Sequence, residues 1–323
     1  MTTVCASAKG KNLIHPLIRF IRTFFMIVGC FAVPLMSIAS DPWIRQTREQ
    51  IKILHAGRET AIFHAGAALD KSYIHPLRTP DRHCVTYDAP ADHLHHRALC
   101  VGWPDISGCD FWAEINSPAG KRGNIIPISV DVIGLPDGST RIVEVNEWRK
   151  EDGTLLLRGI HSWTFLPPQG NLQLLDLDLK LTAAVEDVIF GSDPEKPREY
   201  HGLTWRIGPF ENPRYFNSDG IEGGQDCQGK PAKWCAMTGW QHGRPVTVAI
   251  LDSPANDSHP TRFYVQDQGM QFISSSPNFG KPKRLQNGES WHLQYRIVAA
   301  GAPPEGKEWE FHSLWNEYAR TVK

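Results

Sequence analysis

The sequence predicts an all-β protein, a large antiparallel β-sandwich followed by a short C-terminal helix. Three observations favour this fold. Leucine alternates with polar residues from Leu175 to Thr182, the period of a strand with one buried face. Further β-rich runs are separated by turn signals, and 24 prolines and 27 glycines accompany little helical periodicity. A chain of 323 residues with 41% hydrophobic content can also bury a substantial core.

The remaining elements are expected in chain order. β-rich runs occupy residues 125–133, 142–148, 155–165, 246–251 and 291–298. The hairpin dipeptides Asp152-Gly153 and Asn287-Gly288 are typical of turns between strands. Two long regions, 90–123 and 191–233, are expected to be irregular, and such loops are usually functional. We therefore expect one sandwich domain over residues 45–300.

The end of the chain predicts a helix over residues 303–323, packed back on the sandwich. Pro303-Pro304-Glu305 is typical of a helix start. Aromatic and histidine side chains then recur at about three-residue spacing, at Trp309, His312, Trp315 and Tyr318.

Residues 1–39 have the layout of a secretory signal peptide. Four basic residues precede a 14-residue apolar run that ends at Met36, and Ser37-Ile38-Ala39 resembles a small-x-small cleavage site. The run is shorter than the roughly 20 residues of a membrane-spanning helix. An uncleaved N-terminal anchor, or lipidation at Cys30, is the alternative. We expect an exported protein, periplasmic or extracellular, that touches a membrane only through this segment if the segment is retained.

The charge distribution argues against nucleic acid as a partner. Without the leader, 30 basic residues face 35 acidic ones, a net charge of about -5 with neutral histidines, and no basic residues cluster. No later stretch approaches 18 apolar residues, so the sequence predicts no further membrane segment.

Five cysteines follow the leader: Cys84, Cys100, Cys109, Cys227 and Cys235. An exported protein permits disulfides, and two short-loop pairings remain open, Cys100 with Cys109 and Cys227 with Cys235. The odd count leaves at least one thiol unpaired in a monomer. No Cys-x-x-Cys pair occurs, so a structural zinc knuckle is not expected.

The strongest chemical signal is a histidine-rich stretch. His75, His93, His95 and His96 fall within 22 residues. Histidine titrates near neutrality and is the commonest metal ligand, so this density predicts a functional site. One interpretation is acid/base catalysis by His75, His95 or His96, with the Asp92 carboxylate holding an imidazole in one tautomer.

A divalent metal site, with copper as one candidate, is a second interpretation. His93 and His95 form a His-x-His pair, which on a strand would place both rings on one face, about 6.5 to 7 Å apart. Folding would have to supply further ligands, from Asp92, Glu114, Glu222 or His259. The histidines can instead pack the loop through hydrogen bonds to the backbone.

Arginines and tryptophans near this stretch suit a carbohydrate ligand. The planar fork of arginine matches carboxylates and vicinal hydroxyls, and the flat face of tryptophan matches the apolar face of a pyranose. A core position is the alternative for each tryptophan. The expected substrate-binding residues are Arg78, Arg97, Trp112, Trp205, Arg206, His259 and Arg262.

Several segments together resemble the PmoA-like family of bacterial proteins. Leu94 and Ala98 depart from its pattern, which has proline and glycine there. The resemblance implies a β-sandwich of the carbohydrate-active type, similar in architecture to sugar mutarotases that use a histidine and a carboxylate as acid and base. The family's other label, methane oxygenase, refers to a multi-span membrane protein, and this chain has no such spans. The matching segments are residues 73–80, 92–99, 108–112, 200–206, 251–254 and 259–262.

No dinucleotide-binding glycine motif, P-loop or Gly-x-Ser-x-Gly nucleophile elbow occurs in the chain. We therefore expect a carbohydrate-processing protein, a hydrolase, lyase or isomerase that acts on a sugar or sugar acid with histidine acid/base catalysis. The alternatives are a metal-dependent enzyme or copper-binding protein that uses His93 and His95, and a noncatalytic carbohydrate-binding module.

Overall fold

A computed structural model describes residues 44–46, 50–66, 68–191, 193, 195, 197–305 and 307–322. The chain divides into two units, residues 1–39 and residues 40–323. The leader predicted at residues 1–39 lies outside the described residues. Within the described part of the chain, no helix is both long enough and apolar enough to span a membrane.

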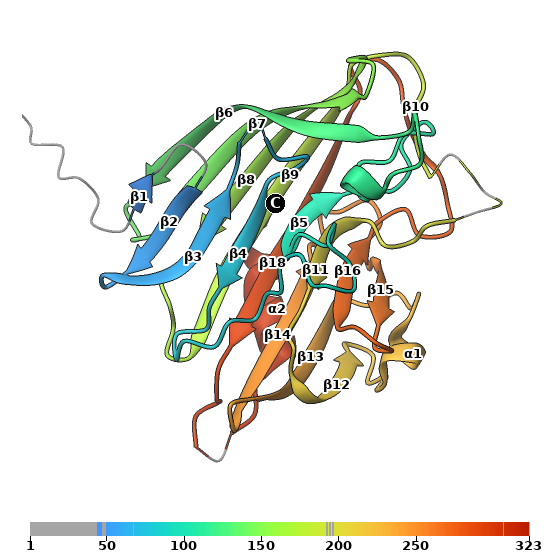
Figure 1. Ribbon diagram of the computed structural model, residues 1–323. Helices are drawn as coiled ribbons and strands as arrows, with labels where there is room; N and C mark the ends of the chain where they lie inside the picture. Colours follow the sequence, from blue (N-terminus) through green and yellow to red (C-terminus); the bar gives the residue numbers. More distant parts are fainter. Residues whose placement is uncertain are drawn as a thin grey trace, which may run out of the picture. The chain divides into compact units, whose positions relative to one another are not determined.

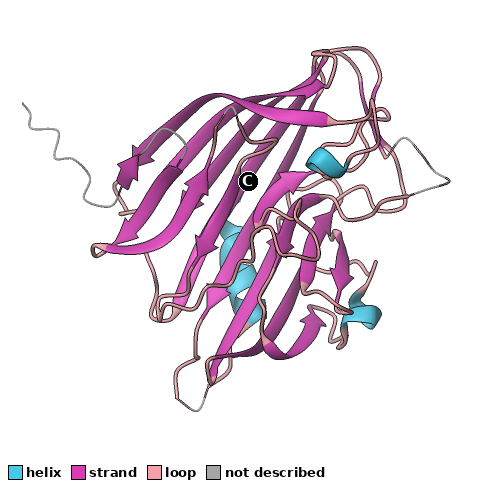
Figure 2. Ribbon diagram, viewed as in Figure 1, coloured by secondary structure: helices cyan, strands magenta, loops and turns pink. Residues whose placement is uncertain are grey.

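Two antiparallel sheets of eight strands each pack face to face, which confirms the all-β sandwich (Figures 1 and 2). The first sheet has the order β1-β2-β3-β4-β5-β11-β16-β15, and the second has the order β12-β13-β14-β18-β9-β8-β7-β6. Strands β10 and β17 form a separate two-stranded ribbon.

The first sheet comprises β1 (Ile44–Gln46), β2 (Gln50–His55), β3 (Arg58–His64), β4 (Tyr73–Leu77), β5 (Leu99–Gly102), β11 (Gly202–Arg206), β15 (Arg262–Gln266) and β16 (Phe272–Ser276). The second comprises β6 (Gly123–Gly134), β7 (Thr140–Lys150), β8 (Leu155–Phe165), β9 (Leu172–Ala183), β12 (Glu211–Asn217), β13 (Trp234–Gln241), β14 (Arg244–Asp252) and β18 (Ser290–Ala300). The other elements are β10 (Val188–Phe190), β17 (Lys283–Leu285), the 3₁₀ turn η1 (Glu114–Asn116), and the helices α1 (Gly224–Cys227) and α2 (Phe311–Thr321).

The leucine alternation lies on β9, as the sequence predicts. Leu175, Leu177, Leu179 and Leu181 are all buried in the main core, where the two sheets meet. The other runs expected to be β-rich lie on β6, β7, β8, β14 and β18. Period-2 patterning identified β9 because its opposite face carries Asp176, Asp178 and Lys180, whereas β14, which is buried on both faces, was recognisable only as a β-rich run.

The two regions expected to be irregular contain regular structure. Residues 90–123 include β5 and η1, and residues 191–233 include β11, β12 and α1. All five residues of β11 and all four of β5 are buried. A strand covered on both faces has no alternation of polar and apolar residues, so the period-2 search missed it.

The C-terminal helix packs on the outer face of the second sheet, away from the main core. Phe311 and Tyr318 of α2 are buried against Leu174, Leu251 and other side chains of that face. The helix begins at Phe311 rather than at residue 303. In Figure 1 this helix lies behind β18 and β14.

Candidate functional site

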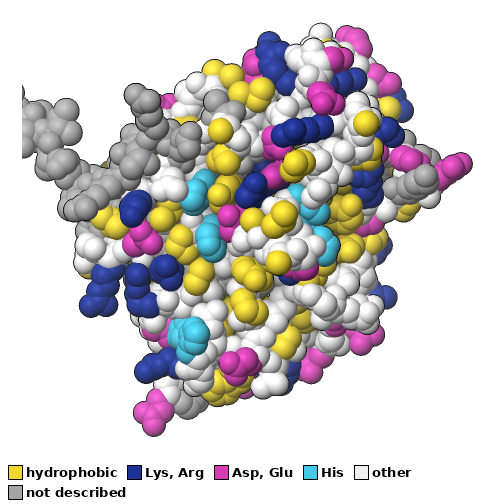
Figure 3. Space-filling view, viewed as in Figure 1, with side chains coloured by type: hydrophobic (Ala, Val, Ile, Leu, Met, Phe, Trp, Pro, Cys, Tyr) yellow, Lys and Arg dark blue, Asp and Glu magenta, His cyan; other side chains and the backbone are white. Residues whose placement is uncertain are grey.

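The outer face of the first sheet carries a second layer of side chains. Strand pairing places Tyr73, Cys100, Thr204, Ser274 and Tyr264 in one row across β4, β5, β11, β16 and β15. Paired residues in neighbouring strands share a face, and the next residue along each strand points to the other. Figure 3 shows histidine side chains among hydrophobic ones on this side of the molecule. This layer positions the candidate site.

A pocket of about 280 Å³ opens on this face. The loop between β4 and β5 provides three imidazoles, and the strands and neighbouring loops provide apolar and aromatic walls. The lining residues are His93, His95, His96, Trp112, Tyr200, Tyr264, Met270 and Phe272. Three of the four histidines of the predicted site therefore converge on one pocket.

The three imidazoles lie close together because the loop turns on itself. The His93 amide donates to the carbonyl of Pro90, and the His96 amide donates to the carbonyl of His93. The rings of His93 and His96 stack with centroids 4.4 Å apart, and His95 packs edge-on to His96 at 4.7 Å. The segment is a turn, so the strand-like His-x-His geometry expected from the sequence is wrong.

Asp92 contacts His93, which corrects its predicted pairing with His95 or His96. One oxygen of Asp92 accepts from His93 Nδ1 at 2.9 Å and from Arg206 Nη2 at 2.7 Å. Burial opposes ionisation, but the hydrogen bond from His93 and the charge of Arg206 together prevail and lower the pKa of Asp92. Asp92 is therefore a carboxylate that holds the neutral form of His93 in the tautomer with its proton on Nδ1.

His95 and His96 are held in their neutral forms. Burial, together with the neighbouring His95 and His93, lowers the pKa of His96 to about 3. Burial and the charge of Lys71 lower the pKa of His95. The Asn116 amide donates to His95 Nδ1 at 3.0 Å, so a neutral His95 carries its proton on Nε2. His95 can donate a hydrogen bond. His96 is too weak a base to be protonated near neutrality, so it has no proton to give as a general acid.

A buried ion triad lies beneath the pocket. Lys71 Nζ donates to the Trp112 carbonyl and to Glu114 Oε1, both at 2.8 Å. The Arg97 guanidinium donates to both carboxylate oxygens of Glu114 at 3.0 to 3.1 Å. Side-chain exposure is 1% for Lys71 and 5% for Glu114. Burial opposes ionisation of Glu114, yet Lys71 and Arg97 together lower its pKa. Arg97 thus supports the wall through Glu114 and is not among the residues that line the pocket.

Sequence reasoning missed Lys71 and Tyr73 in this layer. Nothing distinguishes a lysine that will be buried from the many that stay in solvent, so Lys71 gave no signal. Ala98 adopts φ 41°, a left-handed conformation that favours glycine.

Other predicted residues of this face lie beside the pocket. His75 Nδ1 contacts Thr86 Oγ1 at 2.9 Å, and burial lowers the pKa of His75 although Asp88 opposes the shift. The Nε atom of Arg78 lies 3.9 Å from Oε1 of Glu59. Neither His75 nor Arg78 lines the pocket.

Three predicted ligand contacts lie elsewhere. Trp205 is fully buried in the main core, where its indole donates to the Val85 carbonyl, so it cannot meet a ligand on the outer face. His259 donates to Asp252 at 2.7 Å and stacks on Trp315 of α2. Arg262 donates to the Gly229 carbonyl and lines a different pocket. His259 and Arg262, which were expected to bind the substrate, are therefore not part of the histidine pocket.

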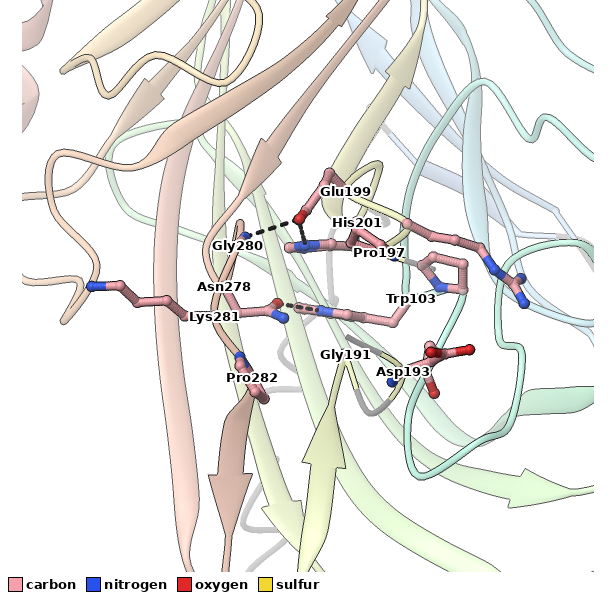
Figure 4. Close-up of a pocket in the computed structure, with 13 residues that line it drawn as sticks. Trp103, Gly191, Asp193, Pro197, Glu199, His201, Asn278, Gly280, Lys281 and Pro282 are labelled. Carbon is pink, nitrogen blue, oxygen red and sulfur yellow. Dashed lines mark hydrogen bonds and ion pairs between the residues drawn. The ribbon is translucent and has the colours of Figure 1, made fainter. Parts of the chain in front are cut away.

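A second pocket of about 150 Å³ lies beside the extended segment 198–201 (Figure 4). Glu199 and His201 line it, whereas Tyr200 between them lines the histidine pocket. His201 Nε2 is 3.4 Å from Glu199, and Trp103 stacks on the imidazole. Burial lowers the pKa of His201. Neither Glu199 nor His201 was among the site residues predicted from the sequence, although His201 lies in the matching segment 200–206.

The metal hypothesis gains no ligand set from the fold. Among the described residues, no group of three or more His, Cys, Asp or Glu side chains is placed to hold a metal ion. The Nδ1 atom of His93 is engaged by Asp92, and that of His95 by Asn116. A divalent metal at His93 and His95 stays a prediction.

The comparisons with known proteins give a family without a biochemical role. No curated protein matches the chain. The model of DUF6807, a family of unknown function, matches residues 50–313, which include every strand of the sandwich except β1 and every residue of the histidine pocket. The resemblance to PmoA-like proteins is not tested by this match and stays a prediction. Because the match covers most of its length, the chain belongs to the DUF6807 family.

Proposed function

We propose that the histidine pocket binds a sugar or sugar acid and that the protein is a carbohydrate-processing enzyme of the hydrolase, lyase or isomerase type. One observation carries the proposal: an oriented carboxylate–histidine pair opens into a pocket with aromatic walls. The rings of Trp112, Tyr200 and Tyr264 offer flat faces for a pyranose. The volume of about 280 Å³ suits a small ligand.

His93 acts as the acid/base group in this proposal. Asp92 accepts a hydrogen bond from His93 Nδ1, so Nε2 is the nitrogen that exchanges a proton with the ligand. The Arg206 side chain is only 4% exposed and keeps Asp92 ionised. His95 donates from Nε2 to a ligand hydroxyl, and His96 packs against both of the other rings. These roles replace the expectation that His95 or His96 exchanges the proton.

A noncatalytic carbohydrate-binding module is the second candidate. Its support is that four of the pocket's eight lining residues are Trp, Tyr or Phe, which suffices for stacking without chemistry. For both candidate functions we also propose that the leader directs export. A third proposal for the same histidines is that they bind a divalent metal.

His93→Gln is expected to lower kcat by about 100-fold or more with little change in KM, because glutamine retains hydrogen bonding but cannot exchange the proton. The assay incubates the purified protein with a panel of reducing sugars, sugar acids and glycosides and follows products and anomer exchange by NMR. His292→Gln, at an exposed histidine on β18, is the matched control and should keep full turnover.

Tyr264→Ala separates the two candidates because it removes a wall and leaves the acid/base pair. We expect about 5-fold to 10-fold weaker binding of the sugar that reacts, from a lost stacking contact. A sugar that binds without product, with affinity reduced in Tyr264→Ala and unchanged in His93→Gln, would favour the binding module. No binding of any sugar on the panel would overturn both.

A further inference from the structure

Two buried thiols meet at the edge of the main core, far from the proposed acid/base pair in the sequence. Cys227 is the last residue of α1, and Cys235 lies on β13, whose neighbour is β12. Their exposures are 1% and 0%. The Cys227 thiol donates to the Ile221 carbonyl, and the same carbonyl accepts from the Asn217 amide. Asn217 on β12 is the register partner of Cys235 on β13, and both cysteines belong to the same core cluster.

The other three described thiols have separate surroundings. The Cys84 thiol donates to the Thr86 carbonyl, and the Cys109 thiol donates to the Arg122 carbonyl. The Cys100 thiol contacts Thr204 on the outer face of the first sheet. Cys100 and Cys109 belong to different apolar clusters, so the Cys100–Cys109 pairing left open by the sequence loses its support.

We propose that Cys227 and Cys235 are a site of intramolecular disulfide formation. Three observations carry the proposal: the Ile221 carbonyl links Cys227 to the register partner of Cys235, both thiols are buried, and both lie in one packed cluster. The bond closes a short loop, residues 227–235, which includes the turn after α1. The proposal is independent of the sugar chemistry proposed for the histidine pocket.

The reaction needs a low-molecular-weight disulfide as oxidant. Cys227 loses its proton and attacks one sulfur of the oxidant, which releases one thiolate and leaves a mixed disulfide. Cys235 then loses its proton and attacks the Cys227 sulfur, which releases the second thiolate. Two protein thiols are oxidised to one S–S bond, and the oxidant is reduced to two thiols. The neighbouring Cys235 side chain lowers the pKa of Cys227, in keeping with this order of attack.

The bond would fix the segment that supports one wall of the histidine pocket. The residues after Cys227 hold β15, because the Val265 amide donates to the Gln228 side chain and the Gly229 amide donates to the Phe263 carbonyl. Tyr264, which lies between Phe263 and Val265 on β15, lines the pocket. Cross-linking Cys227 to Cys235 therefore stabilises the edge strand that carries Tyr264.

The test refolds the full chain with either oxidised glutathione or a reductant, then counts thiols after denaturation. We expect two fewer thiols in the oxidised sample and a Cys227–Cys235 cross-linked peptide by mass spectrometry. The oxidised protein should melt about 5 °C higher, and reductant should reverse the shift.

Cys227→Ser should abolish both the loss of thiols and the change in melting temperature, and Cys235→Ser should do the same if it folds. Cys109→Ser is the matched control, at a buried thiol of the same core cluster, and should still lose two thiols. An unchanged thiol count in the wild-type protein, or a cross-link that involves Cys84, Cys100 or Cys109, would overturn the proposal.

Discussion

Glu114→Gln is expected to lower the free energy of unfolding by about 3 to 5 kcal/mol, because it leaves a buried lysine without its carboxylate. Lys71 is 2% exposed, and Glu114 is its ion-pair partner. The same change removes the partner of Arg97. Urea denaturation at pH 7, followed by tryptophan fluorescence, measures the loss.

Two controls isolate the buried charge as the cause. The double variant Lys71→Met/Glu114→Gln should recover a large part of the loss, because no unpaired buried lysine remains. Glu59→Gln, which removes the carboxylate of a partly exposed pair with Lys52, should cost less than about 1 kcal/mol. A loss in Glu114→Gln no larger than that of Glu59→Gln would show that Lys71 reaches solvent.

Acidification from pH 7 to pH 4 is expected to destabilise the fold, with His161 contributing about 3 kcal/mol. His161 lies on β8, where it faces Glu144 of β7 in register, and burial lowers its pKa from 6.5 to about 3. His161 therefore binds a proton below about pH 6.5 in the unfolded chain but only below about pH 3 in the folded chain. The stability due to neutral His161 is complete above pH 6.5 and is lost as the pH falls toward 3.

His161→Phe should flatten this part of the pH profile, because phenylalanine fills a similar space and does not titrate. Free energies of unfolding measured at several pH values between 4 and 7 give the slope for each variant. His292→Gln on the opposite face of the same sheet should leave the slope unchanged within about 0.5 kcal/mol. Equal slopes in His161→Phe and the wild-type protein would contradict the assignment.

The pocket and the two stability sites differ in how far the sequence revealed them. His93, His95 and His96 were recognisable because three imidazoles within four residues remain close in any fold. Glu144 and His161 were not recognisable as neighbours, because only the register of β7 and β8 brings them to 4.0 Å. Local composition thus predicts where a site lies, and strand pairing decides which distant groups act on it.

Adjacent residues of β11 show the same limit. Trp205 and Arg206 both seemed suited to a ligand, yet one enters the core and the other supports Asp92 on the outer face. Consecutive side chains on a strand point to opposite faces, but assigning the faces requires an alternating pattern. Because every residue of β11 is buried, that strand has no such pattern.

The sequence by itself determined the fold class, the main strands and the histidine loop, because period-2 patterning and residue density are local properties of the chain. Only the tertiary structure decided that Asp92 orients His93, that Lys71 and Glu114 lie beneath the pocket, and that His259 lies apart from it. These contacts depend on strand order, register and the direction of each side chain across two sheets. Long-range pairing fixes all three, and no local pattern encodes them.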